Sequence, residues 1–236
     1  YTALLTGNGT AISSVLFKNL PYSLSRDFRH VSSIASFDLA LIADGNSKFE
    51  TVEDVIAYAK AYPGKLNIGT PRIGSTQHLA SELFKSMARI DAVIVPYKST
   101  GEMIAGLRSN DVQVAFEVLS PILGQVSSKA LRAIAVTASK RFPGLLDVPT
   151  VAESGVPGFD AASWAGISVP AATPDSVVER LSQEIRAAVE SPEVVASLQA
   201  MGYVGEASTP AEMTRRIERD AAKWKAVIEA AQIPRQ

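Results

Sequence analysis

Short apolar runs alternate with amphipathic helical runs along most of the chain. At 112, 114, 116 and 118 the apolar residues recur at every second position, which is the period of a half-buried strand. We expect strands at residues 1–6, 37–43, 66–70, 92–96, 112–118, 131–137 and 163–170. Because helical runs separate these strands, the pattern predicts an α/β fold with a mostly parallel sheet.

Helix signals stand between the strands and after the last of them. Thr51 with Asp54 is typical of a capping box, and we expect further helices at about 75–88 and 100–107, with a short helical segment at 150–154. Beyond residue 170 the pattern predicts helix only. Three helices there are expected to begin at a hydroxyl residue followed by proline, namely Thr173-Pro174, Ser191-Pro192 and Thr209-Pro210.

The order of elements predicts two domains. Residues 44–163 form a continuous βα region, which we expect to fold as one lobe. Residues 1–43 and 164–236 flank this region and would build a second, discontinuous lobe. Two chain crossings, expected near Leu41 and Gly166, would permit hinge bending around a cleft.

Composition narrows the function classes. The 236 residues carry a net charge of −1, with 23 basic and 24 acidic side chains, which gives no electrostatic reason to expect nucleic acid as a partner. The absence of cysteine excludes disulfides, thiolate nucleophiles and cysteine metal sites, and two histidines make a histidine metal centre unexpected. No apolar run approaches the roughly 18 residues that span a bilayer.

The segment from Gly69 to His78 is the most informative loop. It leaves a strand, turns at Gly74 and enters a helix through Ser75 and Thr76. Free N–H groups and the dipole at such a helix start favour a carboxylate or a phosphate. An ordinary capped turn is an equal alternative, and His78 is more often a packed structural residue than a ligand contact.

Other candidates also lie at strand ends. Gly9 and Thr10 belong to an expected turn at 7–10, and Lys98 and Ser99 precede the helix at 100–107. Glu117 lies in an apolar strand, where it is either solvated or directed into a cleft. Because ligands of open α/β sheets bind at the carboxyl ends of strands, the convergence of these loops favours a binding site. A plain turn and a solvated lysine remain alternatives for the first two loops.

Catalytic constellations are absent from the sequence. No G-x-S-x-G motif occurs, and Ser75 and His78 share one helical turn, which is too close for a nucleophile elbow. No paired carboxylates or metal triad can be assembled from the spacing. We therefore expect neither an enzyme nor a cofactor.

A joint set of motifs resembles the Bug-type receptors of the tripartite tricarboxylate transporter family. The resemblance runs in order from residue 1 to about residue 233. Its main segments are Leu20-Pro21-Tyr22, Ala57 to Asn67 (AYAKAYPGKLN), Gly74 to Ala80 (GSTQHLA), Val95-Pro96-Tyr97-Lys98, Leu131 to Thr137 (LRAIAVT), Asp147 to Glu153 (DVPTVAE) and Trp164-Ala165-Gly166.

The resemblance implies a type II periplasmic-binding-protein fold whose two lobes close on a small carboxylate-bearing solute. It also implies a periplasmic location and membrane transporter subunits as partners. Carried onto this chain, the ligand contacts would be Gly9 and Thr10 from the first lobe. The second lobe would contribute Gly74, Ser75, Thr76, His78, Lys98, Ser99 and Glu117.

The chain also departs from the family pattern. Ser99 stands where the family usually has glycine, Glu117 where aspartate is common, and Thr70-Pro71 replaces small residues. No signal peptide is visible, and a family start of about 60 residues, one to two βα units, is expected before residue 1. An incomplete first lobe would expose a sheet edge and favour self-association. An effector-sensing domain of a regulator with this fold is the alternative function.

Overall fold

The computed structural model describes residues 2–236, which divide into two compact units. Unit 1 runs up to Ser36 and resumes at Ser163–Gln236, and unit 2 is Phe37–Ala162. The sequence analysis placed these boundaries after residues 43 and 163. The difference at the first boundary is strand β3 (Leu39–Asp44), which pairs with two strands of unit 2.

Unit 2 is built on a five-stranded sheet in the order β5-β4-β6-β3-β7. Its other strands are β4 (Leu66–Pro71), β5 (Ala92–Tyr97), β6 (Val114–Val118) and β7 (Leu131–Val136). β4 is parallel to β5 and β6, while β3 is antiparallel to β6 and β7. The carboxyl ends of β4, β5, β6 and β7 and the start of β3 therefore share one edge, here called the carboxyl edge.

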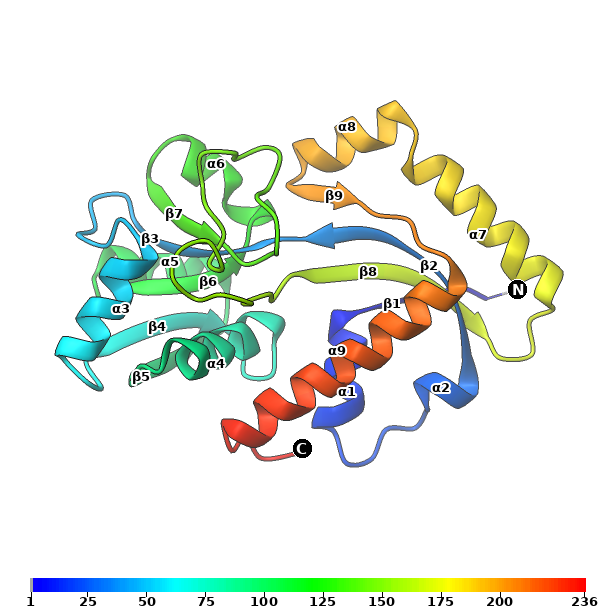
Figure 1. Cartoon of the computed structure of the whole chain (residues 1–236), viewed down its shortest axis with the longest axis horizontal. Helices are drawn as coiled ribbons and strands as arrows, with labels where there is room; N and C mark the ends of the chain where they lie inside the picture. The colour runs from blue at the N-terminus through cyan, green and yellow to red at the C-terminus, as the bar shows by residue number, and fades with distance from the viewer. Residues whose placement is uncertain (1) are drawn as a thin grey trace. The chain divides into compact units, whose positions relative to one another are not determined.

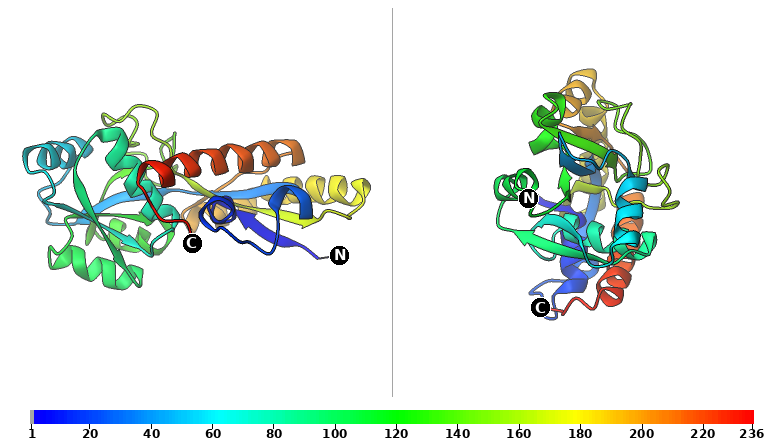
Figure 2. Two further views of the ribbon diagram at one scale, coloured as in Figure 1. Left: turned by 90° about the horizontal axis from the view of Figure 1, so that it is seen from below. Right: turned by 90° about the vertical axis from the view of Figure 1, so that its left-hand side faces the viewer.

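Helices cover both faces of this sheet (Figures 1 and 2). Phe116 of β6 packs on Phe84 of α4 (Thr76–Ala88), with ring centroids 5.7 Å apart. The opposite face of the sheet is covered by α5 (Thr100–Arg108). A Cβ atom added to Gly69 of β4 would lie 3.1 Å from Met103 of α5 and 3.3 Å from Ala115 of β6. Because neighbouring residues of a strand point to opposite faces, α4 and α5 lie on opposite sides of β6.

The remaining helical elements of unit 2 are short. They are α3 (Val52–Ala61), the 3₁₀ turn η1 (Ser120–Ile122) and α6 (Leu123–Ser127). The capping box of α3 is confirmed: Thr51 Oγ1 accepts from Asp54 N, and Asp54 Oδ2 accepts from Thr51 N. The predicted helical segment at 150–154 is wrong, because Thr150 and Glu153 exchange capping bonds across a turn that does not continue as a helix.

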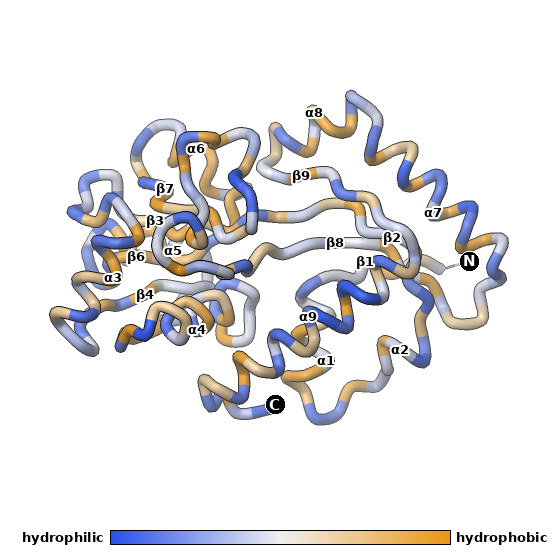
Figure 3. Tube along the Cα trace, in the orientation of Figure 1, coloured by the Kyte–Doolittle hydropathy of each residue, from blue (hydrophilic) through white to orange (hydrophobic). Residues whose placement is uncertain are grey.

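Unit 1 holds a four-stranded sheet in the order β1-β8-β2-β9. Its strands are β1 (Leu4–Gly7), β2 (Phe28–Phe37), β8 (Ser163–Pro170) and β9 (Tyr203–Gly205), and its helices are α1 (Asn8–Leu16), α2 (Leu24–Asp27), α7 (Asp175–Val189), α8 (Pro192–Ala200) and α9 (Pro210–Ala230). Hydrophobic and hydrophilic positions alternate along α7 and α9 (Figure 3), as they do in helices that bury one face. Val178 of α7 packs on Val31 and Val169, whereas Met213 and Ile217 of α9 pack on Trp164.

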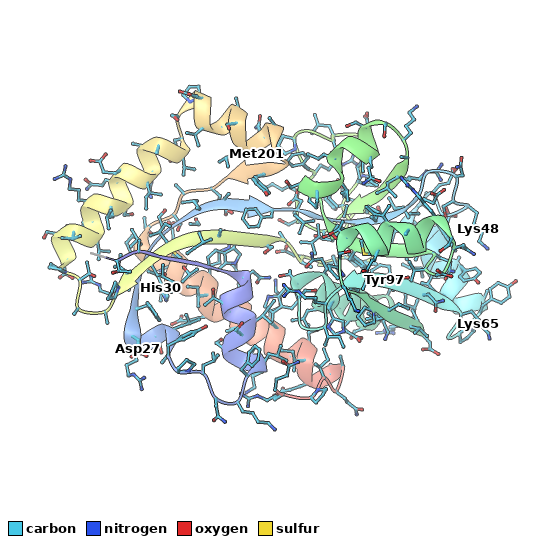
Figure 4. All side chains as sticks on the ribbon, turned by 180° about the vertical axis from the view of Figure 1, so that it is seen from behind. Asp27, His30, Lys48, Lys65, Tyr97 and Met201 are labelled. Atoms are coloured by element: carbon cyan, nitrogen blue, oxygen red, sulfur yellow. The ribbon has the colours of Figure 1, made fainter. Side chains whose placement is uncertain are left out.

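The sequence analysis missed strand β2 because its inward side chains are partly polar. His30 (labelled in Figure 4) is buried, and its Nδ1 lies 2.9 Å from Ser168 Oγ of β8. Ser32 is also buried, and its Oγ accepts from Ser208 N at 3.0 Å. Hydrogen bonds replace apolar contacts on this face, so the period of the strand is hidden in the sequence.

Two further predictions for unit 1 are wrong. Residues 7–10 are not a turn: α1 begins directly after Gly7, whose N–H donates to Thr10 Oγ1 at 3.1 Å as a cap. The region beyond residue 170 is not helix only, because β9 adds an edge strand to the sheet. Residues 7–10 and β9 are short segments, so their conformation depends on contacts with distant parts of the chain more than on their own sequence.

The three predicted hydroxyl-proline helix starts differ in detail. Thr209 forms the full capping box with Glu212, and Trp224, Val227 and Ile228 of the same helix are buried. Ser191 is the N-cap of α8, but its hydroxyl donates backward to the Ala188 carbonyl. The helix expected after Thr173 starts one residue later, with Pro174 as its N-cap. Among residues 2–236, none of the helices is long and apolar enough to cross a membrane.

Candidate ligand-binding site

The start of α4 is a tight, internally bonded turn. Ser75 is the N-cap: its Oγ accepts from His78 N at 3.2 Å and donates to the Pro71 carbonyl at 2.8 Å. Gly74 has a φ of +78°, a conformation that a side chain would strain. The predicted helix start is therefore confirmed, and glycine is required at the turn.

The buried side chain of His78 accepts a hydrogen bond from the backbone of this turn. The Gly74 N–H donates to His78 Nδ1 at 3.4 Å, and only 7% of the residue is exposed. Burial lowers the pKa of His78, with a smaller contribution from Lys85, against the opposing charge of Glu82. The ring is therefore neutral near pH 7, and Nδ1 acts as an acceptor. His78 is therefore packed and bonded within the turn, and contact with a ligand stays a prediction.

The start of α5 is capped in the same way. Ser99 Oγ accepts from Glu102 N at 3.2 Å, and Glu102 Oε2 accepts from Lys98 N at 3.2 Å. Ser99, which departs from the family's usual glycine, is thus the N-cap of a helix. The Lys98 residue is exposed, as expected for a surface lysine.

The two helix starts share an edge and a backbone bond. β4 and β5 are paired through Thr70 and Pro96, so α4 and α5 begin side by side at the carboxyl edge. Arg72 N donates to the carbonyl of Tyr97 at 3.1 Å; Tyr97, labelled in Figure 4, ends β5. Both dipoles therefore direct their positive ends to the same region, which can hold an anion such as a carboxylate.

Glu117 ties the two helix starts together. It is 2% exposed; its Oε1 accepts from Gln77 Nε2 and Val118 N, each at 2.8 Å, and its Oε2 accepts from Thr100 Oγ1 at 2.7 Å. Glu117 is therefore not solvated, and internal donors occupy its carboxylate. The sequence analysis missed Gln77 and Thr100; each is a polar residue in the first turn of a helix that follows a strand end.

A second carboxyl group lies at the carboxyl edge. Asp38 directly precedes β3 and is 5% exposed, and its carbonyl accepts from Leu119 N just beyond β6. Burial, together with the negative charge of Asp160, raises the pKa of Asp38 to about 6. An acidic residue inside the apolar run at 37–43 was the signal that could have identified it.

Gly9 and Thr10 lie in unit 1, in the first turn of α1, while the other seven predicted residues lie in unit 2. Unit 1 also has a groove of about 800 Å³ between α1, α2, β2, α7 and α9, and none of the nine predicted residues lines it. In the described part of the chain, no three His, Asp or Glu side chains gather as metal ligands.

The chain matches the family model described as the tripartite tricarboxylate transporter family receptor over residues 1–233. A relative from Pseudomonas sp. (strain P51), the UPF0065 protein in the tcbD-tcbE intergenic region, is 30% identical over 229 residues. That match covers 97% of this chain and 68% of the relative.

Solved structures give the same result. The R. palustris protein Rpa4515 with adipate is 31% identical with a TM-score of 0.84, covering 99% of this chain and 79% of that one. The periplasmic binding protein BugD is 25% identical with a TM-score of 0.81, covering 100% of this chain and 80% of that one. These matches confirm the predicted two-lobed α/β fold of periplasmic binding proteins, and the chain belongs to the tripartite tricarboxylate transporter receptor family.

Proposed function

We propose that this chain captures a small carboxylate-bearing solute in the periplasm and presents it to the membrane subunits of a tripartite tricarboxylate-type transporter. The observation that carries the proposal is the pair of helix starts at the carboxyl edge of unit 2, joined by Glu117. A carboxylate can accept backbone N–H bonds at such a place without a cationic side chain. Family membership supplies the context for that chemistry.

The ligand is proposed to be a small mono-, di- or tricarboxylic acid. Rpa4515, which shares 31% of its sequence with this chain, has been solved with adipate. Gly74, Ser75, Thr76 and Ser99 are the proposed contacts in unit 2. Contacts from Gly9, Thr10, His78, Lys98 and Glu117 stay predictions, and the internal bonds of His78 and Glu117 favour a positioning role for those two.

Self-association is also proposed, through strand β1. β1 is at one edge of the unit 1 sheet, and Leu4 and Leu5 are 38% and 65% exposed. An exposed edge with apolar side chains is a template for pairing with another strand. The named relatives include a periplasmic binding protein, which favours the receptor over the regulator domain that the sequence left as an alternative.

Thermal unfolding with matched ligands tests the proposal. We expect adipate, succinate or citrate at millimolar concentration to raise the melting temperature, because a ligand that binds only the folded state stabilises it. Adipamide, which has the length of adipate without its charges, is expected to give no shift. If none of the acids raises the melting temperature above the adipamide control, the assignment is wrong.

A further inference from the structure

The Asp38 carboxyl is a buried charge without a partner inside unit 2. The residue is 5% exposed, and its one hydrogen bond uses the backbone carbonyl. No salt bridge reaches it among the described residues; its electrostatic neighbour is another acid, Asp160. Glu117, the other buried carboxylate of this edge, has three donors.

Backbone pairing fixes where Asp38 lies. Leu39 N donates to Thr137 Oγ1 at 3.3 Å, and Thr137 N donates to the Leu39 carbonyl at 2.9 Å. Leu119 N reaches Asp38 from the other side, so Asp38 stands between the ends of β6 and β7. Ala161 N donates to the Thr137 carbonyl, which places Asp160 on the next segment.

This position lies close to the helix starts that we propose bind a carboxylate. β6 separates β3 from β4, and neighbouring strands are about 4.8 Å apart, so the start of β3 is about 10 Å from the end of β4. Ala40 of β3 is paired with Glu117 of β6, whose side chain reaches both helix starts. A ligand of a few carbons can span that distance.

The charged residues around Asp38 do not stabilise its carboxylate. The segments bonded to Asp38 and Leu39 are 118–119 and 136–137, and residues 160–161 are bonded to Thr137 in turn. Asp160 is the one charged residue in these three segments. Glu117 follows as the nearest acid along β6. Removing a carboxylate from water with no cation or donor nearby destabilises a fold, so an apolar or amide residue would stabilise this site better. Groups of this kind cluster at functional sites.

We propose that Asp38 determines ligand specificity. Its carboxyl accepts a hydrogen bond from an ammonium, hydroxyl or protonated carboxyl group of the ligand. The same ligand is the small acid whose carboxylate is bound at the starts of α4 and α5. This inference rests on the proposed function and narrows it. The ligand class is a small carboxylic acid with a second group that donates a hydrogen bond. An acid that lacks the donor leaves Asp38 unpaired and binds more weakly.

Isothermal titration of the 236-residue chain with two matched pairs of acids tests the proposal. The pairs are succinate with malate, and adipate with 2-aminoadipate. In at least one pair we expect the donor-bearing acid to bind about 10-fold more tightly, because a hydrogen bond to a charged group is strong. Asp38→Asn should reduce that ratio to about 3-fold or less. The control Asp91→Asn changes an exposed aspartate just before β5, at the opposite edge, and should keep the wild-type ratio.

The outcomes separate this inference from the proposed function. Acids that bind without discrimination within either pair, or a ratio unchanged by Asp38→Asn, overturn the role of Asp38 and leave the receptor assignment intact. Absence of binding by all four acids overturns this inference, and the receptor assignment is overturned as well if citrate also fails to bind. A melting temperature at pH 7.5 that falls in Asp38→Asn would show that the carboxyl has a structural partner, which also contradicts the proposal.

Discussion

Units 1 and 2 bury polar side chains in different ways. In unit 1 the buried groups are mostly neutral and join each other across strands: Thr6 Oγ1 lies 2.8 Å from Ser168 Oγ, which lies 2.9 Å from His30 Nδ1. In unit 2 two carboxyl groups are buried at one edge of the sheet. Glu117 has its donors inside the unit, whereas Asp38 has none.

This difference separates polar groups that hold the fold from polar groups that are open to a ligand. The hydroxyl and imidazole groups of this chain in unit 1 bond to one another within the sheet. These hydrogen bonds compensate for the burial of the groups. Glu117 is also satisfied, and it orders two helix starts. Asp38 is a buried acid whose charged neighbour is another acid, and such a residue indicates function rather than stability.

The largest expected effect is at Glu117. Glu117→Ala leaves the Gln77, Thr100 and Val118 donors without their acceptor and should lower the free energy of unfolding by about 3–5 kcal/mol. Glu117→Gln retains one oxygen and an amide that can donate to the Thr100 hydroxyl, so about 1–2 kcal/mol is expected. Urea denaturation measures both values.

The matched control for Glu117 is Glu179→Ala, because Glu179 is exposed on α7 in unit 1. Its effect should stay within about 0.5 kcal/mol. Equal stability of Glu117→Ala and this control would contradict the role assigned to the Glu117 carboxylate.

The next effect has the opposite sign. A carboxyl whose pKa is raised to about 6 in the folded state stabilises the fold less as the pH rises from about 4 through 6, because ionisation is easier in the unfolded chain. Asp38→Asn should therefore raise the free energy of unfolding by about 2 kcal/mol at pH 7.5, with a smaller gain at pH 5. Denaturant titrations at the two pH values measure this. A gain that is the same at both pH values would refute a buried, ionising Asp38.

A smaller effect is expected from the polar chain of unit 1. Ser168→Ala removes the hydroxyl between Thr6 and His30 and should lower the free energy of unfolding by about 1.5 kcal/mol. Carboxylate affinity should not change, since Ser168 belongs to the sheet of unit 1. If ligand affinity fell as much as stability, the division between structural and ligand-directed polar groups would be wrong.

The smallest effect is expected at an exposed cap. Thr51→Ala removes the acceptor for Asp54 N at the start of α3 and should cost about 1 kcal/mol. Thr51→Ser keeps the hydroxyl and should restore most of the stability. Thermal unfolding of the three proteins gives the order, and a serine variant as unstable as the alanine variant would show that the cap bond is not the cause.

Sequence reasoning succeeded where the interaction is local. The capping box of Thr51 with Asp54 joins residues three apart, and the helix starts expected at Ser75 and Thr209 are likewise capped by bonds to residues three positions on. Such bonds depend on a few neighbouring residues, so their pattern is visible in the sequence. The carboxyl edge was predictable for the same reason, because each loop follows its own strand.

It failed where partners are distant in the sequence. His30 and Ser168 are 138 residues apart, and their bond explains why β2 tolerates a buried imidazole. Gln77 and Glu117 are 40 residues apart, so Glu117 could be predicted near the site, but its three donors could not. The absence of a partner for Asp38 is likewise a property of the folded sheet.

The central claim is that the starts of α4 and α5 bind a carboxylate, and backbone amide chemical shifts test it most directly. We predict that titrating ¹⁵N-labelled protein with adipate, succinate and citrate in turn shifts the amide resonances of residues 74–77 and 99–101 for at least one acid, and that neutral adipamide does not shift them. Amide shifts absent from both helix starts for all three acids, or equally large with adipamide, would contradict the account.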